Sequence, residues 1–306
     1  MLCQCYFVVV LFRGCQTGDW HVTGVHPFTC PEDINLSMKD ILQLIQVHIP
    51  FRLLKGEFLD MVIEKGIHPE ISFDHNILDV NRTADYKNVA RRFHDAGRTV
   101  TFHAPFLDLR PGSLDPRIRD VTLLRLRQIF GIALIFRPRM VVCHPSFDIR
   151  YYITAEEMWL HNSIATWRRV LELADQADTV IAFENVYEEN PEELGLLFDA
   201  LDSRRIRLCF DTGHFNVYSR TPLNDWMDRL GTFMGEVHIH DNKGEKDEHL
   251  PIGEGTFPFR RFFDAMRDCG ARAVFTVEAH SEEDLWVFVR NLEAWREHLE
   301  DLIQDL

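Results

Sequence analysis

The sequence predicts a single-domain α/β protein of the (β/α)8 class, a TIM barrel in which eight parallel strands are surrounded by helices. Two observations support this prediction. From residue 44 onward, eight short apolar segments alternate in strict order with eight amphipathic helical segments. This pattern indicates parallel strands joined by helical crossovers. In addition, side chains alternate within the predicted strands as closure into a barrel requires.

The predicted elements follow one another directly along the chain. We expect strands at 44–49, 70–73, 99–103, 140–144, 179–184, 206–211, 235–240 and 273–278. We expect helices near 56–65, 83–96, 116–136, 155–177, 191–201, 223–230, 258–268 and 281–304. An open doubly wound sheet is the alternative fold, but neither a GxGxxG nor a phosphate-loop motif follows the first predicted strand.

In six of the predicted strands, the alternation can be counted from a polar residue at or near the carboxyl end. If those side chains point into the barrel, the residues one or three positions away from them point outward toward the helices. The outward set is entirely apolar, as strands covered by helices require: Val100, Phe102, Val141, Cys143, Ile181, Phe183, Leu208, Phe210, Val237, Ile239, Phe275 and Val277. The inward set is mixed: Thr101, Val142, Ala182, Cys209, Glu236 and Thr276.

Residues 1–43 do not fit the repeating pattern, and four of the seven cysteines lie within the first 30 residues. The sequence therefore predicts an N-terminal extension at 1–43 and a barrel at 44–306. Because Met38 would be a natural start, we expect residues 1–37 to be over-translated upstream sequence or a disordered tail. A short element preceding the barrel is the alternative. A native protein whose mass places its N-terminus at Met1 would reject over-translation.

Charge and composition exclude several classes of protein. The chain has 33 Lys and Arg against 48 Asp and Glu, a net charge of −15 that disfavours nucleic acid as a partner. The longest apolar run, Cys5–Phe12, is too short for a membrane span of about 20 residues and lacks the features of a signal peptide. Without a CxxC pair, the cysteines predict neither a disulfide framework nor a structural zinc site. We expect a cytoplasmic protein; the sequence does not predict its oligomeric state.

Metal-ligating residue types occupy the carboxyl ends of the third to eighth strands, which meet at one rim of a closed barrel. These residues are His103, His144, Glu184, Asp211, His238 and Glu278, and nearby loops add His214, Asp247 and His249. Each has an ordinary structural explanation, such as a hydrogen-bonded buried histidine or a carboxylate that caps a helix. Asp211, which precedes Thr-Gly, also fits a turn. Their joint occurrence instead predicts a metal site, because clustered carboxylates need a cation. Imidazole and carboxylate together suit Zn²⁺ or Mn²⁺.

At these residues the sequence resembles the xylose isomerase-like TIM barrels, which include sugar phosphate isomerases, epimerases and the endonuclease IV (AP endonuclease family 2) group. The matching segments are 102–106, 142–145, 183–185, 209–214, 238–244, 247–255 and 276–280. The stretch from His238 to Gly255 is the most specific of them.

The resemblance implies two uses of this rim. In isomerases and epimerases, residues corresponding to Glu184, Asp211, His238 and Glu278 hold one divalent metal, and the two glutamates move protons on opposite faces of the sugar. In endonuclease IV, three zinc ions activate hydroxide for phosphodiester cleavage. One would be held by His103, His144 and Glu184, the second by the set of four named above, and the third by His214, Asp247 and His249. All nine residues are present, so ligand identity does not discriminate.

The surrounding loops favour sugar chemistry. Residues 185–193 are strongly acidic and would repel a DNA backbone. Arg110, Arg117 and Arg119 either bind a phosphate or form a solvated helix start.

We therefore predict a divalent-metal-dependent isomerase or epimerase acting on a small sugar, polyol or sugar phosphate. Glu184 and Glu278 would be catalytic, with one to three Zn, Mn or Co ions as cofactor. A trinuclear-zinc phosphodiesterase and a non-catalytic metal-binding barrel are the alternatives. We expect the substrate to contact His240, Asn185 and Lys243. His240 fits equally well as a group that orients a ligand, and Lys243 as a solvated side chain.

Overall fold

The eight strands form a closed, all-parallel barrel in the order β1 to β8, with β8 pairing back onto β1. The computed structural model describes residues 36–304. The strands are β1 Gln46–Pro50, β2 His68–Ser72, β3 Thr101–His103, β4 Met140–Cys143, β5 Val180–Glu184, β6 Ile206–Asp211, β7 Met234–Ile239 and β8 Val274–Val277. The predicted single-domain (β/α)8 barrel is confirmed.

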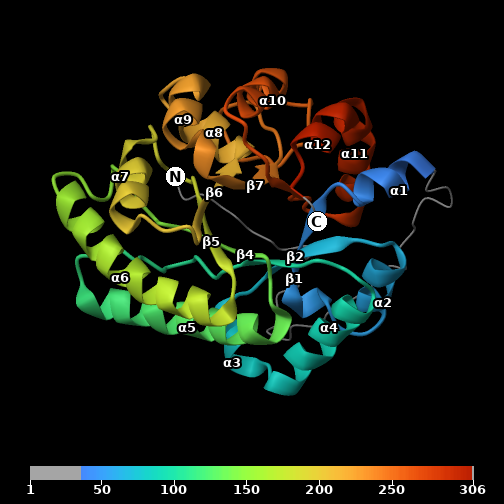
Figure 1. Ribbon diagram of the computed structural model, residues 1–306, viewed down its shortest axis with the longest axis horizontal. Coiled ribbons are helices and arrows are strands. Elements are labelled where there is room, and N and C mark those ends of the chain that lie inside the picture. The colour runs from blue at the N-terminus through green and yellow to red at the C-terminus, as the bar shows by residue number, and fades with distance from the viewer. Residues whose placement is uncertain (1–35, 305–306) are drawn as a thin grey trace, which may run out of the picture.

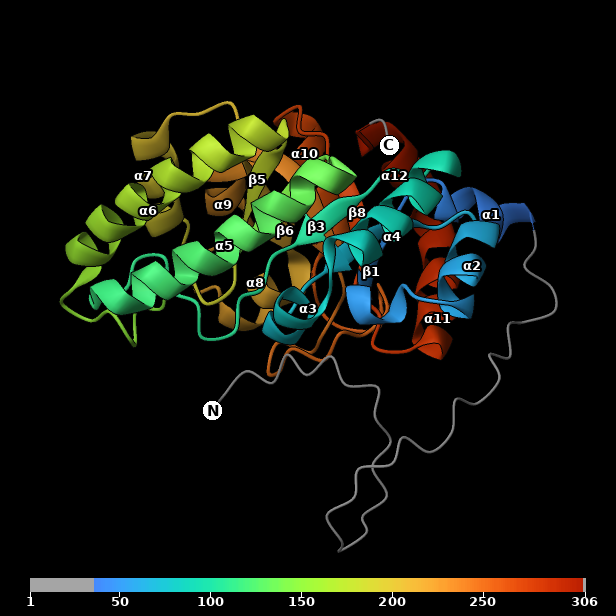
Figure 2. The ribbon, with the colours of Figure 1, turned by 90° about the horizontal axis from the view of Figure 1, so that it is seen from below.

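Helices surround the barrel on its outer side (Figures 1 and 2). Those that correspond to the predicted segments are α2 Glu57–Glu64, α4 Thr83–Asp95, α5 Pro116–Phe136, α6 Glu156–Ala177, α7 Glu192–Leu201, α9 Leu223–Leu230, α10 Phe259–Asp268 and α11 Glu282–Leu292. The helix predicted at 281–304 is interrupted by a 3-10 turn at Glu293–Trp295 and resumes as α12 Arg296–Leu302. None of the helices in the described part of the chain combines the length and apolar character needed to cross a membrane.

Three further helices lie outside the predicted set: α1 Leu36–Leu42, α3 His75–Val80 and α8 Thr212–Tyr218. Helix α1 falls within the extension predicted at 1–43, and it buries Met38, Ile41 and Leu42 in the hydrophobic core. The rest of that predicted extension, residues 1–35, lies outside the described residues. The division at residue 43 remains a prediction.

The hydrophobic core has two layers, as the side-chain alternation predicts. The large outer layer, between strands and helices, contains the outward residues of the strands, such as Phe102, Phe183 and Phe210. A small apolar cluster inside the barrel consists of Met140, Val142, Ala182, Cys209 and Val274. The interior is mixed, as predicted, because the buried polar side chains of Thr101, Glu236 and Thr276 lie in it as well.

Candidate metal centre

The structure brings the nine predicted ligand residues together at the carboxyl ends of the strands. Seven are buried, and His144 and Asp247 are half-buried. His103, Glu184 and Asp211 are the last residues of β3, β5 and β6. Because barrel strands converge at this end, residues far apart in sequence come within interaction distance.

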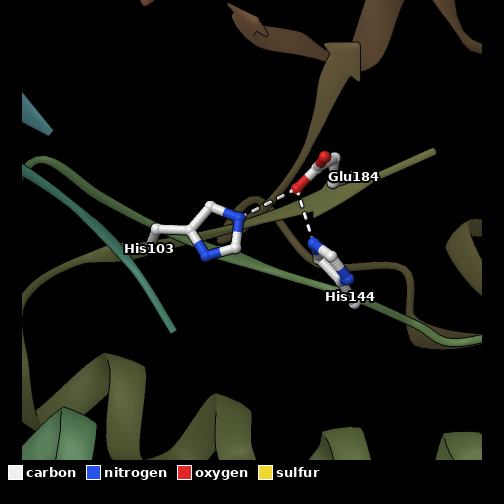
Figure 3. A group of neighbouring side chains, drawn as sticks. All are labelled: His103, His144 and Glu184. Carbon is white, nitrogen blue, oxygen red and sulfur yellow. Dashed lines mark hydrogen bonds and ion pairs between the residues drawn. The ribbon is translucent and has the colours of Figure 1, made fainter. Parts of the chain in front are cut away.

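Glu184 is a shared partner of three imidazoles. Its Oε2 lies 3.1 Å from Nε2 of His103 and 2.8 Å from Nε2 of His144 (Figure 3). Its Oε1 lies 3.1 Å from Nδ1 of His214. Burial would raise the pKa of Glu184, but the imidazoles, His144 and His238 foremost, hold it well below its usual range. Glu184 is therefore an anion at the centre of the cluster.

His238 presents one ring nitrogen to three carboxylates. Its Nδ1 lies 3.3 Å from Oε1 of Glu278 and 3.7 Å from both Oε1 of Glu184 and Oδ2 of Asp211. This buried Nδ1 has no hydrogen-bond partner among the described residues. Because buried polar atoms are nearly always paired, an imidazole nitrogen facing three carboxylate oxygens fits a divalent cation with N and O ligands. The four residues are those assigned to one metal by the family resemblance.

A third group centres on Asp247, in the loop after β7. Its Oδ2 lies 3.1 Å from Nε2 of His249 and 3.4 Å from Nε2 of His214. His240, predicted as a substrate contact, lies in this group: its Nδ1 is 3.5 Å from Oδ1 of Asp247, and its Nε2 is 3.0 Å from Oδ2 of Asp211. Neither that Nδ1 nor that Oδ1 has a hydrogen-bond partner among the described residues. His240, Asp247 and His249 could thus hold a cation as a set.

The absence of a side chain at Gly213 leaves room for the His240 ring. A Cβ on Gly213 would collide with the His240 ring. The ring also stacks on that of His249, with centroids 4.0 Å apart. Burial would lower the pKa of His240, but Asp211 and Asp247 outweigh it and raise the pKa to about 9.

Two buried ionisable residues beneath this cluster were not predicted from the sequence, His48 on β1 and Glu70 on β2. Nδ1 of His48 lies 2.7 Å from Oε1 of Glu70 and 3.3 Å from Oε1 of Glu278. Burial would lower the pKa of His48, but these two carboxylates raise it to about 9. The available signal was an ionisable residue within each of the first two predicted strands, which the search of strand ends passed over.

The other residues predicted to contact a substrate or phosphate lie outside these ligand groups. The amide of Asn185 already exchanges two hydrogen bonds with the backbone of Asp211, at 2.9 and 3.0 Å. Lys243 is exposed in the loop after β7. Arg119 donates to the carbonyls of Ser113 and Leu114 near the start of α5. The guanidinium of Arg110 lies 4.0 Å from the Tyr151 ring centroid. The interactions of Arg119 match the helix-start interpretation.

Residues 68–305 match the family described as xylose isomerase-like TIM barrel, and the chain belongs to this family. The predicted resemblance is thus confirmed. An uncharacterized protein of Methanocaldococcus jannaschii is 29% identical over 208 residues, which cover 66% of this chain and 70% of the relative. A "Probable endonuclease 4" of Lachnoclostridium phytofermentans is 25% identical over 176 residues, 52% of this chain and 58% of the relative.

The solved structures share the fold. A D-tagatose 3-epimerase-like protein superposes with a TM-score of 0.70 at 23% identity, covering 84% of this chain and 98% of its own. At this identity the likeness establishes the barrel architecture only, and the chemistry of the site must be argued from its own residues.

Proposed function

We propose that this protein is a divalent-metal-dependent isomerase or epimerase acting on a small sugar, polyol or sugar phosphate. The observation that carries the proposal is the unpartnered Nδ1 of His238, which faces Glu184, Asp211 and Glu278. A divalent cation held by these four residues would polarise a carbonyl or hydroxyl oxygen of the sugar and acidify the neighbouring C–H bond.

Glu184 and Glu278 are the proton-transfer groups in this proposal. Imidazoles hold the pKa of both carboxyls well below the usual range despite burial, so both are ionised. Glu184 ends β5 and Glu278 directly follows β8, and these two strands are not neighbours in the barrel. Two carboxylates approaching from different directions suit removal of a proton from one face of a carbon and its return to the other.

The charge of the loops supports a small substrate over a polynucleotide. The loop after β5 carries Glu188 and Glu189, helix α7 that follows it begins with Glu192 and Glu193, and the whole chain has a net charge of −15. A DNA backbone would be repelled by this loop, whereas a neutral sugar would not.

The proposal is tested by incubating the protein with Mn²⁺, Co²⁺ or Zn²⁺ and a panel of ketoses, aldoses and their phosphates in D₂O. We expect metal-dependent incorporation of deuterium next to the sugar carbonyl, with loss of incorporation in Glu278→Gln. Glu283→Gln, the same change at an exposed position of α11, is the matched control and should remain active. Absence of exchange from every sugar with each metal would contradict the proposal.

A trinuclear-zinc phosphodiesterase is the second candidate. It is favoured by the convergence of His103 and His144 on Glu184 and of His214 and His249 on Asp247, which supplies the two additional ligand groups. Cleavage of abasic DNA or of a small phosphodiester by the zinc-loaded protein, without sugar exchange, would favour this candidate over the isomerase.

A further inference from the structure

Glu70, in the middle of β2, joins the two histidines beneath the candidate metal centre. Its side chain is fully buried. Oε1 lies 2.7 Å from Nδ1 of His48, and Oε2 lies 3.1 Å from Nε2 of His238. We propose that Glu70 is a positioning residue that holds the ring proton of His238 on Nε2, so that Nδ1 is free to bind a cation.

The two nitrogens of the His238 ring have different surroundings. A neutral imidazole carries a single proton, and a metal binds the nitrogen that lacks it. Nδ1 of His238 faces Glu278, Glu184 and Asp211 at 3.3 to 3.7 Å, so Nδ1 is the nitrogen that a cation would take. The proton must then stay on Nε2, where an N–H group buried without an acceptor would be destabilising. The Oε2 atom of Glu70 is that acceptor.

Without Glu70, the ring proton of His238 would prefer Nδ1 to Nε2. Three carboxylate oxygens surround Nδ1, and each would attract a proton to that nitrogen. A proton on Nδ1 would compete directly with the cation. Carboxylates that accept the second N–H of a ligating histidine typically affect metal affinity 10–100-fold, and Glu70 is placed to act in this way.

Glu70 is itself fixed in position. The second oxygen is held by His48, whose Nδ1 also lies 3.3 Å from Oε1 of Glu278. His48 thus links Glu70 to Glu278, the candidate ligand next to β8. The other oxygen of Glu70 contacts His238, the candidate ligand on β7. A carboxylate held at both oxygens has little freedom to rotate away, so the orientation of His238 is set before any cation arrives.

The inference rests on the cation-binding part of the proposed function and is independent of the sugar reaction. The test is the Zn²⁺ affinity of the full-length protein, measured by competition with a chromophoric chelator. We expect Glu70→Leu to bind zinc about 10–100-fold more weakly. Glu70→Gln should lose less, because its amide oxygen can still accept from Nε2. Thr101→Val, which removes a buried hydroxyl within the same barrel, should bind zinc as the wild type does.

A second readout separates positioning from a general effect on folding. Histidine ¹⁵N NMR of the zinc-loaded wild type, with His238 assigned by its loss in His238→Asn, should show zinc on Nδ1 and the proton on Nε2. Zinc on Nε2, or a folded Glu70→Leu protein with wild-type affinity, would overturn the inference. If Glu70→Leu does not fold, Glu70→Gln and the wild-type spectrum still test it. A wild type that binds no divalent cation would instead contradict the proposed function itself.

Discussion

Strands β3 to β8 and strands β1 and β2 contribute to the candidate centre in different ways. In the first group, the predicted ligands stand at or next to the last residue of each strand, as His103, Glu184 and Glu278 do. In the second group, His48 and Glu70 lie at mid-strand and face each other in the β1–β2 register. The strand ends thus supply the groups that would face a cation in the proposed site, whereas the mid-strand residues contact those groups from below.

The largest difference between the two regions should appear in turnover. Glu184→Gln removes the anion that three imidazoles share, and with it one of the two proposed proton-transfer groups. We expect sugar exchange to fall by about 10²–10⁴, measured as deuterium incorporation by NMR at saturating metal. Exchange within a few-fold of the wild type would remove Glu184 from the proposed reaction.

Glu188, in the loop after β5, gives a second prediction, which concerns the effect of pH on stability. Burial raises the pKa of its carboxyl from 4.5 to about 7. Between these values the folded state retains a proton that the unfolded state has lost, so the free energy of unfolding falls as pH rises and levels off above pH 7. Glu188→Gln lacks this loss and should be more stable than the wild type at pH 8, by up to about 3 kcal/mol.

Denaturant unfolding at pH 5 and pH 8 measures this effect. The advantage of Glu188→Gln should shrink as the pH is lowered toward 4.5. Glu189→Gln, the same substitution at the exposed neighbouring position, is the control and should show no such trend. An equal difference from the wild type at both pH values would show that Glu188 does not titrate in this range.

The space reserved for His240 gives a third prediction. In Gly213→Ala the new Cβ collides with the His240 ring, and we expect a loss of stability of about 1–3 kcal/mol, typical of overpacking. Gly131→Ala on α5, where a Cβ meets nothing within 4 Å, should stabilise the helix by up to about 1 kcal/mol. Thermal unfolding of both variants checks the pair; equal effects would show that His240 yields freely.

The smallest expected effect concerns His48. In His48→Leu, Glu70 keeps its contact with His238 but loses the one that restrains its other oxygen. We expect zinc affinity to fall by about tenfold, the lower end of the range for groups that support metal ligands. A larger loss than in Glu70→Leu would show that His48 acts on the cation directly, and the distinction between strand ends and mid-strand positions would no longer hold.

Strand order, side-chain alternation and the nine rim residues were predictable from sequence because each depends on short-range pattern. His48 and Glu70 carried the same signal but stand at mid-strand, so their place under His238 depends on barrel register. The contact between His240 and Asp247 was not predictable, because it depends on the path of the loop after β7. Helix α8 was not predicted, because Asp211 was interpreted as a metal ligand or turn residue. Asp211 faces the cluster, but its Oδ1 also accepts from the His214 backbone N–H as the N-cap of this helix.

The central claim is that the strand ends form a divalent-cation site for isomerase or epimerase chemistry. Elemental analysis of the wild type, purified without chelator and without added metal, tests it most directly. We predict about one metal ion per chain, exchangeable for Mn²⁺ or Co²⁺ and lost in Glu278→Gln. About three zinc ions per chain would contradict the isomerase assignment in favour of the phosphodiesterase, and a metal-free protein that takes up no added cation would contradict the site itself.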